Sequence, residues 1–178
     1  NAKNLDLNRD FIKCDSKNAA SFSKMYNHWN PDVYVETHTT NGSDHQYTLT
    51  LISSQKDKLA KQIATFQEET LVPQLYELMA KEGKEMIPYV YSLNGNPKEG
   101  IKAFLETPRY STGYTALHHS FGFITEAHVF KPYEDRVNHT LAFLKILLQE
   151  SATYKSEIKE ARKASIIESQ ASNTQVVN

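Results

Sequence analysis

The stretch PDVYVETHTTNGSDHQYTLTL, from Pro31 to Leu51, decides the fold that the sequence predicts. Its β-branched and aromatic run from Val33 to Glu36 predicts a short strand, and Asn41-Gly42 predicts a turn. The segment from His45 to Leu51 then alternates as a second strand would. His38 therefore lies where a strand runs out into a loop, and ligands and catalytic groups collect at that position in open α/β sheets. A structural histidine that hydrogen-bonds a neighbour fits the same pattern.

The rest of the chain alternates predicted strands and helices, a pattern typical of a single α/β domain. The run FGFITEAH, between His119 and His128, predicts a buried strand. We expect Val33–His38 and Phe121–Glu126 to be central strands, because both are apolar enough to be buried on two faces. The run from Tyr133 to Thr153 predicts a long helix, since its apolar residues recur at three-to-four spacing.

Weaker patterns complete the predicted fold. Helical spacing recurs from Ser53 or Ser54 to about Glu82, where Pro73 predicts a break or kink, and the segment 108–113 predicts a loop. Together the elements predict a three-layer α/β/α fold with a mainly parallel, twisted sheet, formed by residues 1–170 as one domain. Residues 171–178 lack a core pattern and are predicted to be a frayed tail.

The composition argues against several classes of function. The chain has 178 residues, enough for one domain with a substantial core. Its 20 basic and 21 acidic residues give a net charge of -1, so no nucleic-acid partner is expected, since phosphate binding needs a clear Lys/Arg excess. No apolar run approaches the roughly 20 residues of a membrane span. The single cysteine, Cys14, excludes an internal disulfide and a cysteine-based zinc site.

Several polar side chains stand out against this framework. Glu126 lies in an apolar strand, where a carboxylate must be paired, bound to a ligand or shifted in pKa. A structural salt bridge would satisfy it, and so would a role as general base for a water molecule. Asn8 and Arg9 lie in a polar loop, where an arginine is either solvated or a two-pronged donor to a carboxylate. Tyr110 and Tyr114 lie in a Ser/Thr/Gly loop, where tyrosine either packs or donates to a substrate.

Taken in order, these segments resemble the zinc carboxypeptidases of the carboxypeptidase A type. LDLNRDF, at 5–11, resembles that family's Asn-Arg motif, and VYVETHTTNGSDHQYTLT, at 33–50, resembles the strand that ends in its third zinc ligand. PRYSTGY, at 108–114, followed by FGFITEAHVFKPYEDRV, at 121–137, resembles the tyrosine loop and the strand with the catalytic glutamate. The similarity is closest to bacterial, secreted members with a His-Thr-Thr-Asn-Gly motif. It covers the chain from Leu5 to about Leu148.

The resemblance implies how a substrate would be held. Asn8 and Arg9 would grip the terminal carboxylate of a peptide, and Tyr110, or else Tyr114, would cover the substrate. The partner would thus be a peptide with a free C-terminus. The family's secreted members imply a secreted or periplasmic protein, although no signal peptide is visible in this chain.

The resemblance also implies a metal. His38 would be a zinc ligand, and Glu126 would be the base and proton shuttle for a zinc-bound water. The family takes two further ligands from an earlier His-x-x-Glu motif, but none of the seven histidines here has glutamate three residues later. One zinc ion is therefore expected only where upstream ligands are supplied. Either the chain is the C-terminal part of a longer domain, which its start at Asn1 favours, or its lineage has lost the metal.

These inferences predict the C-terminal portion of a zinc-dependent exopeptidase, a metallocarboxypeptidase that hydrolyses C-terminal residues from peptides. A domain that lacks its N-terminal strands would have an open sheet edge, which invites association with a partner chain. Two alternatives stay open at this point. One is a non-catalytic relative that binds peptides, and the other is an amidase or deacylase of the same superfold, which also uses an Asn-Arg pair to hold a carboxylate.

Overall fold

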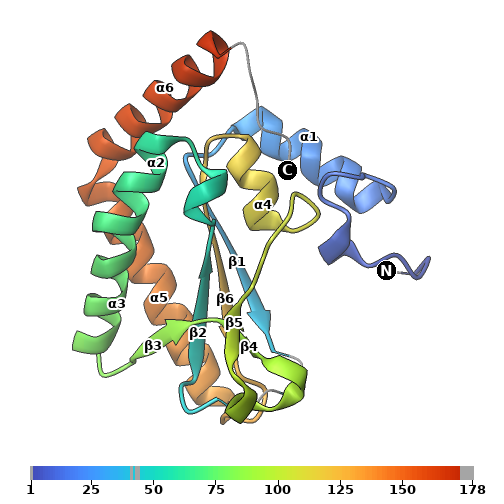
Figure 1. Cartoon of the computed structure of the whole chain (residues 1–178), viewed down its shortest axis with the longest axis vertical. Coiled ribbons are helices and arrows are strands. Elements are labelled where there is room, and N and C mark those ends of the chain that lie inside the picture. The colour runs from blue at the N-terminus through green and yellow to red at the C-terminus, as the bar shows by residue number, and fades with distance from the viewer. Residues whose placement is uncertain (1, 41, 43–44, 173–178) are drawn as a thin grey trace.

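The computed structural model describes residues 2–40, 42 and 45–172. Six α-helices and six strands are interspersed along these residues (Figure 1). The helices are α1 (Lys17–Trp29), α2 (Lys61–Phe66), α3 (Val72–Lys81), α4 (Ser111–Leu117), α5 (Tyr133–Thr153) and α6 (Lys155–Ala171). The strands are β1 (Val33–Thr39), β2 (Leu49–Ser53), β3 (Met86–Pro88), β4 (Val90–Ser92), β5 (Ile101–Ala103) and β6 (Phe121–Ala127).

The main sheet has the strand order β1-β6-β2-β3. β1 pairs with β6 in parallel and β2 pairs with β3 in parallel, whereas β2 and β6 are antiparallel. β4 and β5 form a separate antiparallel ribbon. The prediction of an α/β fold with a mostly parallel sheet is thus confirmed.

The two faces of the sheet carry different cores, because successive side chains of a strand point to opposite faces. Phe121 and Phe123 belong to a large aliphatic core, and α2, α3, α5 and α6 lie on one side of the strands in Figure 1. On the other face Tyr34 packs against a smaller aromatic cluster that includes Tyr26 of α1 and Tyr114 of α4. Helices therefore cover both faces, and α1 and α4 are the ones nearest the candidate site.

The prediction of two central strands is right for β6 and wrong for β1. Every β6 residue except Glu126 is buried, as expected for a strand between β1 and β2. β1 lies at the edge of the sheet that the described residues form, and all its residues are partly or fully exposed. The parallel pairing with β6 nevertheless fixes its register. The apolar pattern of β1 therefore indicated a strand but not the position of that strand in the sheet.

Three local predictions also differ from the structure. The segment 108–113 is predicted to be a loop, but α4 begins within it, at Ser111. Six of the seven residues of α4 are buried, so packing outweighs the low helix propensity of its Ser/Thr/Gly sequence. β2 begins at Leu49 rather than at His45. Pro73 does not break the helix, because it lies in the first turn of α3, directly after a π-helical segment at Gln67–Leu71.

The remaining predictions concern the C-terminal tail, the Asn41-Gly42 turn and membrane-spanning segments. Residues 173–178 of the predicted frayed tail, like Asn41 of the predicted turn, lie outside the described residues. Within the described part of the chain, no helix combines the length and the apolar character needed to cross a membrane.

The close approach of α4 to β6 predicts the effect of a single added methyl group. A Cβ atom at Gly122 would lie 2.2 Å from Oγ1 of Thr115 and 2.7 Å from Oγ of Ser54, and both of these side chains are buried. We expect Gly122→Ala to lower the free energy of unfolding by about 1–3 kcal/mol, the usual cost of overpacking. Urea denaturation measures this change.

Thr115→Ala provides the matched background, because it removes the nearest atom. Gly122→Ala should cost less stability in Thr115→Ala than in the wild type. An equal cost in the two backgrounds would contradict the packing of α4 on β6.

Candidate functional site

A cleft of about 210 Å³ lies at the carboxyl ends of β1 and β6, on the face of the sheet that carries the aromatic cluster. Segments far apart in the chain contribute to it. Five residues singled out from the sequence line it: Asn8, Arg9, His38, Tyr110 and Glu126. The remaining lining residues are Thr39, Thr40, Ile52, Tyr89, Tyr91, Phe104 and Ile124.

The parallel register of β1 and β6 produces the centre of the cleft. His38 lies opposite Glu126, so the two side chains emerge on the same face of the sheet. Nδ1 of His38 lies 3.3 Å from Oε1 of Glu126. Their side chains are only 25% and 13% exposed, so solvent screens this pair less than a surface ion pair. The carboxylate of Glu126, partly buried at the end of an otherwise buried strand, thus has a partner within the protein.

A second carboxylate holds the other side of the imidazole. Nε2 of His38 lies 3.3 Å from Oε2 of Glu36, and the same oxygen accepts a hydrogen bond of 2.5 Å from the Ser111 hydroxyl at the start of α4. Burial raises the pKa of Glu36, but hydrogen bonds from His38 and Ser111 outweigh it and lower the pKa overall. Sequence reasoning missed Glu36, although its spacing of two residues from His38 places both on one face of a strand.

The two carboxylates stabilise the protonated imidazole. The hydrogen bond with Glu126, followed by the one with Glu36, raises the pKa of His38 to about 9, against the opposing effect of burial. His38 is therefore a cation at neutral pH in this structure. The centre of the cleft is therefore a group of three side chains, the His38 imidazolium between the carboxyl groups of Glu36 and Glu126.

Asn8 and Arg9 reach the cleft from a short 3-10 turn, Leu7–Arg9. Oδ1 of Asp6 accepts a hydrogen bond of 2.9 Å from the Asn8 backbone N–H and caps this turn. Phe11 then anchors the segment in the aromatic cluster. The Asp6 cap and the packing of Phe11 thus place the side chains of Asn8 and Arg9 at the cleft.

The Arg9 guanidinium lies over an aromatic ring. Its Cζ atom is 4.4 Å from the centroid of the Tyr110 ring, a cation–π contact, and Nη1 donates a 2.8 Å hydrogen bond to the Asn8 carbonyl oxygen. Among the ion pairs of the described residues, none involves Arg9. Its side chain is therefore positioned by the Tyr110 ring and has donors left for an anionic ligand.

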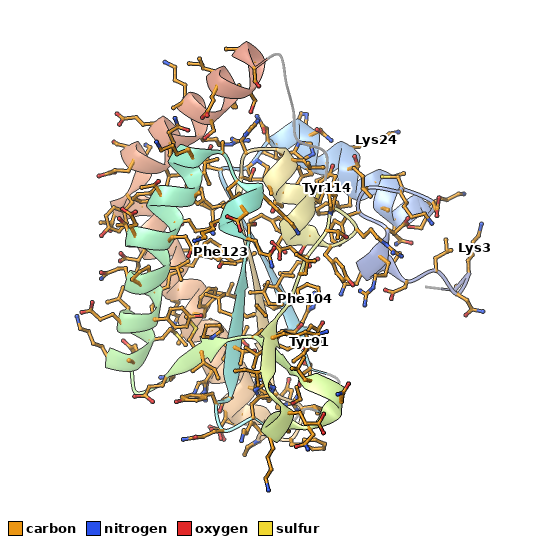
Figure 2. The ribbon with its side chains drawn as sticks, in the orientation of Figure 1. Lys3, Lys24, Tyr91, Phe104, Tyr114 and Phe123 are labelled. Atoms are coloured by element: carbon orange, nitrogen blue, oxygen red, sulfur yellow. The ribbon has the colours of Figure 1, made fainter. Side chains whose placement is uncertain are left out.

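Aromatic rings from outside β1 and β6 form a second side of the cleft, the aromatic wall, which consists of Tyr89, Tyr91, Phe104 and Tyr110. Phe104 packs edge-on against Tyr110 with 4.8 Å between ring centroids, and it lies 5.7 Å from Tyr91. Figure 2 shows Phe104 and Tyr91 side by side. Tyr89 adjoins both rings. Sequence reasoning missed these three residues, because aromatic residues in short strands and loops more often fill a core.

Tyr114 lies elsewhere. It is 4% exposed and packs in the aromatic cluster with Tyr26 and Phe11, and its hydroxyl lies 3.3 Å from that of Ser23. Figure 2 shows it apart from Phe104 and Tyr91. Of the two tyrosines singled out from the loop sequence, Tyr110 is therefore the one at the cleft.

The described residues do not make up a metal centre by themselves. Within that part of the chain, no group of three or more His, Cys, Asp or Glu side chains is placed to hold a metal ion. Both ring nitrogens of His38 face carboxylate oxygens instead. A catalytic zinc site needs about three protein ligands, so two would have to be added to His38.

Comparisons with protein-family models, with curated proteins and with solved structures found no match to this chain.

The position of His38 predicts how the stability of the chain depends on pH. A histidine whose pKa in the folded chain, about 9, exceeds its ordinary value of 6.5 stabilises the fold fully below the ordinary value. That contribution disappears as the pH rises through the folded value. We expect the free energy of unfolding to fall across this window, and His38→Gln to flatten the fall. Denaturation at a series of pH values measures both.

His28→Gln is the matched control, because His28 is exposed on α1 and is not among the residues that line the cleft. The decline with pH should persist in that variant. A His38 ring whose NMR signals titrate near pH 6.5 in the folded wild type would contradict the proximity of the two carboxylates.

Proposed function

We propose that this chain is the C-terminal portion of a zinc-dependent metallocarboxypeptidase, which removes C-terminal residues from peptides. The observation that carries the proposal is the convergence of Arg9, His38 and Glu126 on one cleft. They come from three segments that are well separated in the sequence. A cationic donor, a histidine and a partly buried carboxylate in one cleft suit the hydrolysis of a peptide that ends in a free carboxylate.

Arg9 and Asn8 would bind the terminal carboxylate of the peptide. A guanidinium presents parallel N–H donors that match the two carboxylate oxygens. The ring of Tyr110 holds the guanidinium plane from one side, which reduces the freedom that Arg9 loses when a ligand binds. A peptide without a free carboxylate would offer no charged acceptor to this clamp, so the clamp would select exopeptidase substrates.

Glu126 would act as the general base. A carboxylate can take a proton from a water molecule as it attacks the scissile carbonyl, and it can return that proton to the leaving amine. In this structure His38 holds Oε1 of Glu126 at 3.3 Å, and the apolar strand around the carboxylate limits its exposure to water. His38 would thus orient the base in this chain. To act as the zinc ligand that the resemblance implies, it would have to lose a proton and release one of the two carboxylates.

Zinc enters the proposal only where a longer polypeptide supplies the missing ligands. The described residues do not form a three-ligand set, and His38 is the one zinc ligand that the resemblance assigns to this chain. A secreted or periplasmic location is also part of the proposal, and it rests on the resemblance. An association with a partner chain is proposed from the open edge of β1 in the sheet that the described residues form.

A second candidate function is peptide binding without cleavage, in a relative that has lost the metal. The observation that favours it is the same lack of a three-ligand group among the described residues. Such a protein would keep the Arg9 clamp and the aromatic wall. Binding and turnover therefore have to be measured separately.

The clamp predicts selective binding of peptides with a free C-terminus. We expect Arg9→Gln to weaken the binding of an N-acylated dipeptide by roughly tenfold to a hundredfold, since a hydrogen bond to a charged group is worth about 1.5–3 kcal/mol. Isothermal calorimetry with the free acid measures the loss. The C-terminally amidated form of the same dipeptide should bind the wild type as weakly as the acid binds Arg9→Gln.

Arg109→Gln is the matched control for charge, because Arg109 is exposed near the same loop and does not line the cleft. Its affinity for the acid should equal that of the wild type. Equal binding of the acid and the amide by the wild type would rule out the carboxylate clamp.

The number of ligands predicts weak metal binding by the chain alone. After chelator treatment and addition of zinc, we expect calorimetry to give weak zinc binding and a peptide assay to give no release of a C-terminal residue, because about three protein ligands are required. Tight binding of one zinc ion, with turnover that is lost in Glu126→Gln, would show instead that this chain carries a complete site.

A further inference from the structure

The segment 104–110 connects β5 to α4 and carries two of the rings that form the aromatic wall. Phe104 and Tyr110 pack against each other within it, and Tyr110 supports the Arg9 guanidinium. The segment itself has no helix or strand from Phe104 to Tyr110. Its position over the cleft must therefore be held by contacts outside regular secondary structure.

A buried carboxyl group lies in the middle of this segment. Glu106 is fully buried, and its Oε1 atom accepts a 2.6 Å hydrogen bond from the backbone N–H of Gln55. The side chain of Gln55 in turn donates a 2.8 Å hydrogen bond from Nε2 to the backbone oxygen of Phe104. Two hydrogen bonds thus join the segment to Gln55, which lies two residues beyond the end of β2.

The next residue toward β2 fixes the other side of the segment. The hydroxyl of Ser54 donates a 3.0 Å hydrogen bond to the backbone oxygen of Thr112 in α4. Ser54 also accepts, through its backbone oxygen, a 2.7 Å hydrogen bond from the buried Gln67 side chain. Ser54 therefore fixes the start of α4, which directly follows the segment 104–110.

A carboxyl group is a costly choice for a purely structural contact here. Burial raises the pKa of Glu106 above its ordinary range, against the opposing effect of the Gln55 N–H. No ion pair among those of the described residues involves it, and its Oε2 atom has no hydrogen-bond partner among them. Of the interactions that oppose the effect of burial, the hydrogen bond from the Gln55 N–H is the largest, ahead of those with its own backbone N–H and with Lys58.

We infer that Glu106 is the positioning residue that holds Phe104 and Tyr110 over the cleft, through its hydrogen bond to Gln55. The residue touches no ligand itself, and it is not among the residues that line the cleft. It acts through the two rings and, by way of Tyr110, on the Arg9 guanidinium. Its effect on peptide binding rests on the proposed function, whereas its effect on the rings does not.

The test is an NMR comparison of Glu106→Ala, Glu106→Gln and wild type. Because the Arg9 guanidinium lies over the Tyr110 ring, the ring current shifts the Arg9 side-chain signals in the folded chain. In Glu106→Ala we expect this shift to shrink, the Phe104–Tyr110 ring contacts to weaken, and the Gln55 amide to exchange roughly tenfold faster or more. Glu106→Gln keeps an acceptor oxygen, so it should retain all three wild-type signatures.

Glu99→Ala is the matched control, because Glu99 is an exposed glutamate that precedes the same segment and whose side chain accepts hydrogen bonds from Asn94 and Asn96. A Glu106→Ala variant that unfolds more easily, yet keeps the Arg9 shift and the ring contacts while folded, would overturn the inference and leave Glu106 a packing residue. Wild-type signatures throughout in Glu106→Ala would overturn it as well.

Gln55→Pro keeps the test decisive if Glu106→Ala fails to fold. The φ angle of Gln55 is -65°, the value that proline adopts, so the substitution removes the N–H and the side-chain donor together without changing φ. Gln55→Ala is the reference variant, because it removes the side-chain donor to Phe104 and keeps the N–H that Glu106 binds. A larger loss of the Arg9 shift in Gln55→Pro than in Gln55→Ala supports the inference, and equal shifts in the two variants contradict it. A fall in affinity for the free-acid dipeptide should accompany the loss. If the wild type binds no peptide, the proposed function fails while the ring signatures still decide the role of Glu106.

Discussion

The parallel pairing of β1 with β6 is the constraint on which the candidate site depends. Its register places His38 opposite Glu126 on one face of the sheet, where the imidazole and the carboxylate meet at 3.3 Å. A slip of one residue would move the whole set of β1 side chains to the opposite face. The aliphatic core on one side and the aromatic cluster on the other both resist such a slip, because each holds alternate residues of β1.

The remaining parts of the cleft are arranged around this pair. Glu36 holds the second nitrogen of His38 and is itself held by Ser111, so the start of α4 is linked to the strand ends. One residue earlier in the chain, Tyr110 supports the Arg9 guanidinium. Glu36 and the Arg9 guanidinium are thus connected through Tyr110 and Ser111, where the segment 104–110 meets α4. Through the Gln55 N–H, Glu106 fixes that segment from the far side.

The sequence alone was sufficient for the strand-end position of His38 and for the position of the Glu126 carboxylate within an apolar strand, because a strand pattern and an isolated charge within it are local signals. It was not sufficient for Glu36, whose importance depends on which face of β1 meets α4. It also failed to predict α4, since the Ser/Thr/Gly composition there disfavours a helix and only burial between β6 and the aromatic cluster stabilises it. The edge position of β1 depends on strand order, which hydrophobic patterns do not specify.

The central claim is that His38 and Glu126 interact directly across the two strands, and a double-mutant cycle measures this interaction most directly. The free energies of unfolding of the wild type, His38→Ala, Glu126→Ala and the double variant should be compared near neutral pH, where His38 is protonated. The structure predicts a favourable coupling energy of about 1–3 kcal/mol, typical of contacting charged groups. Effects that add to within about 0.3–0.5 kcal/mol, as for distant independent sites, would show that the pair does not form and would contradict this account of the site.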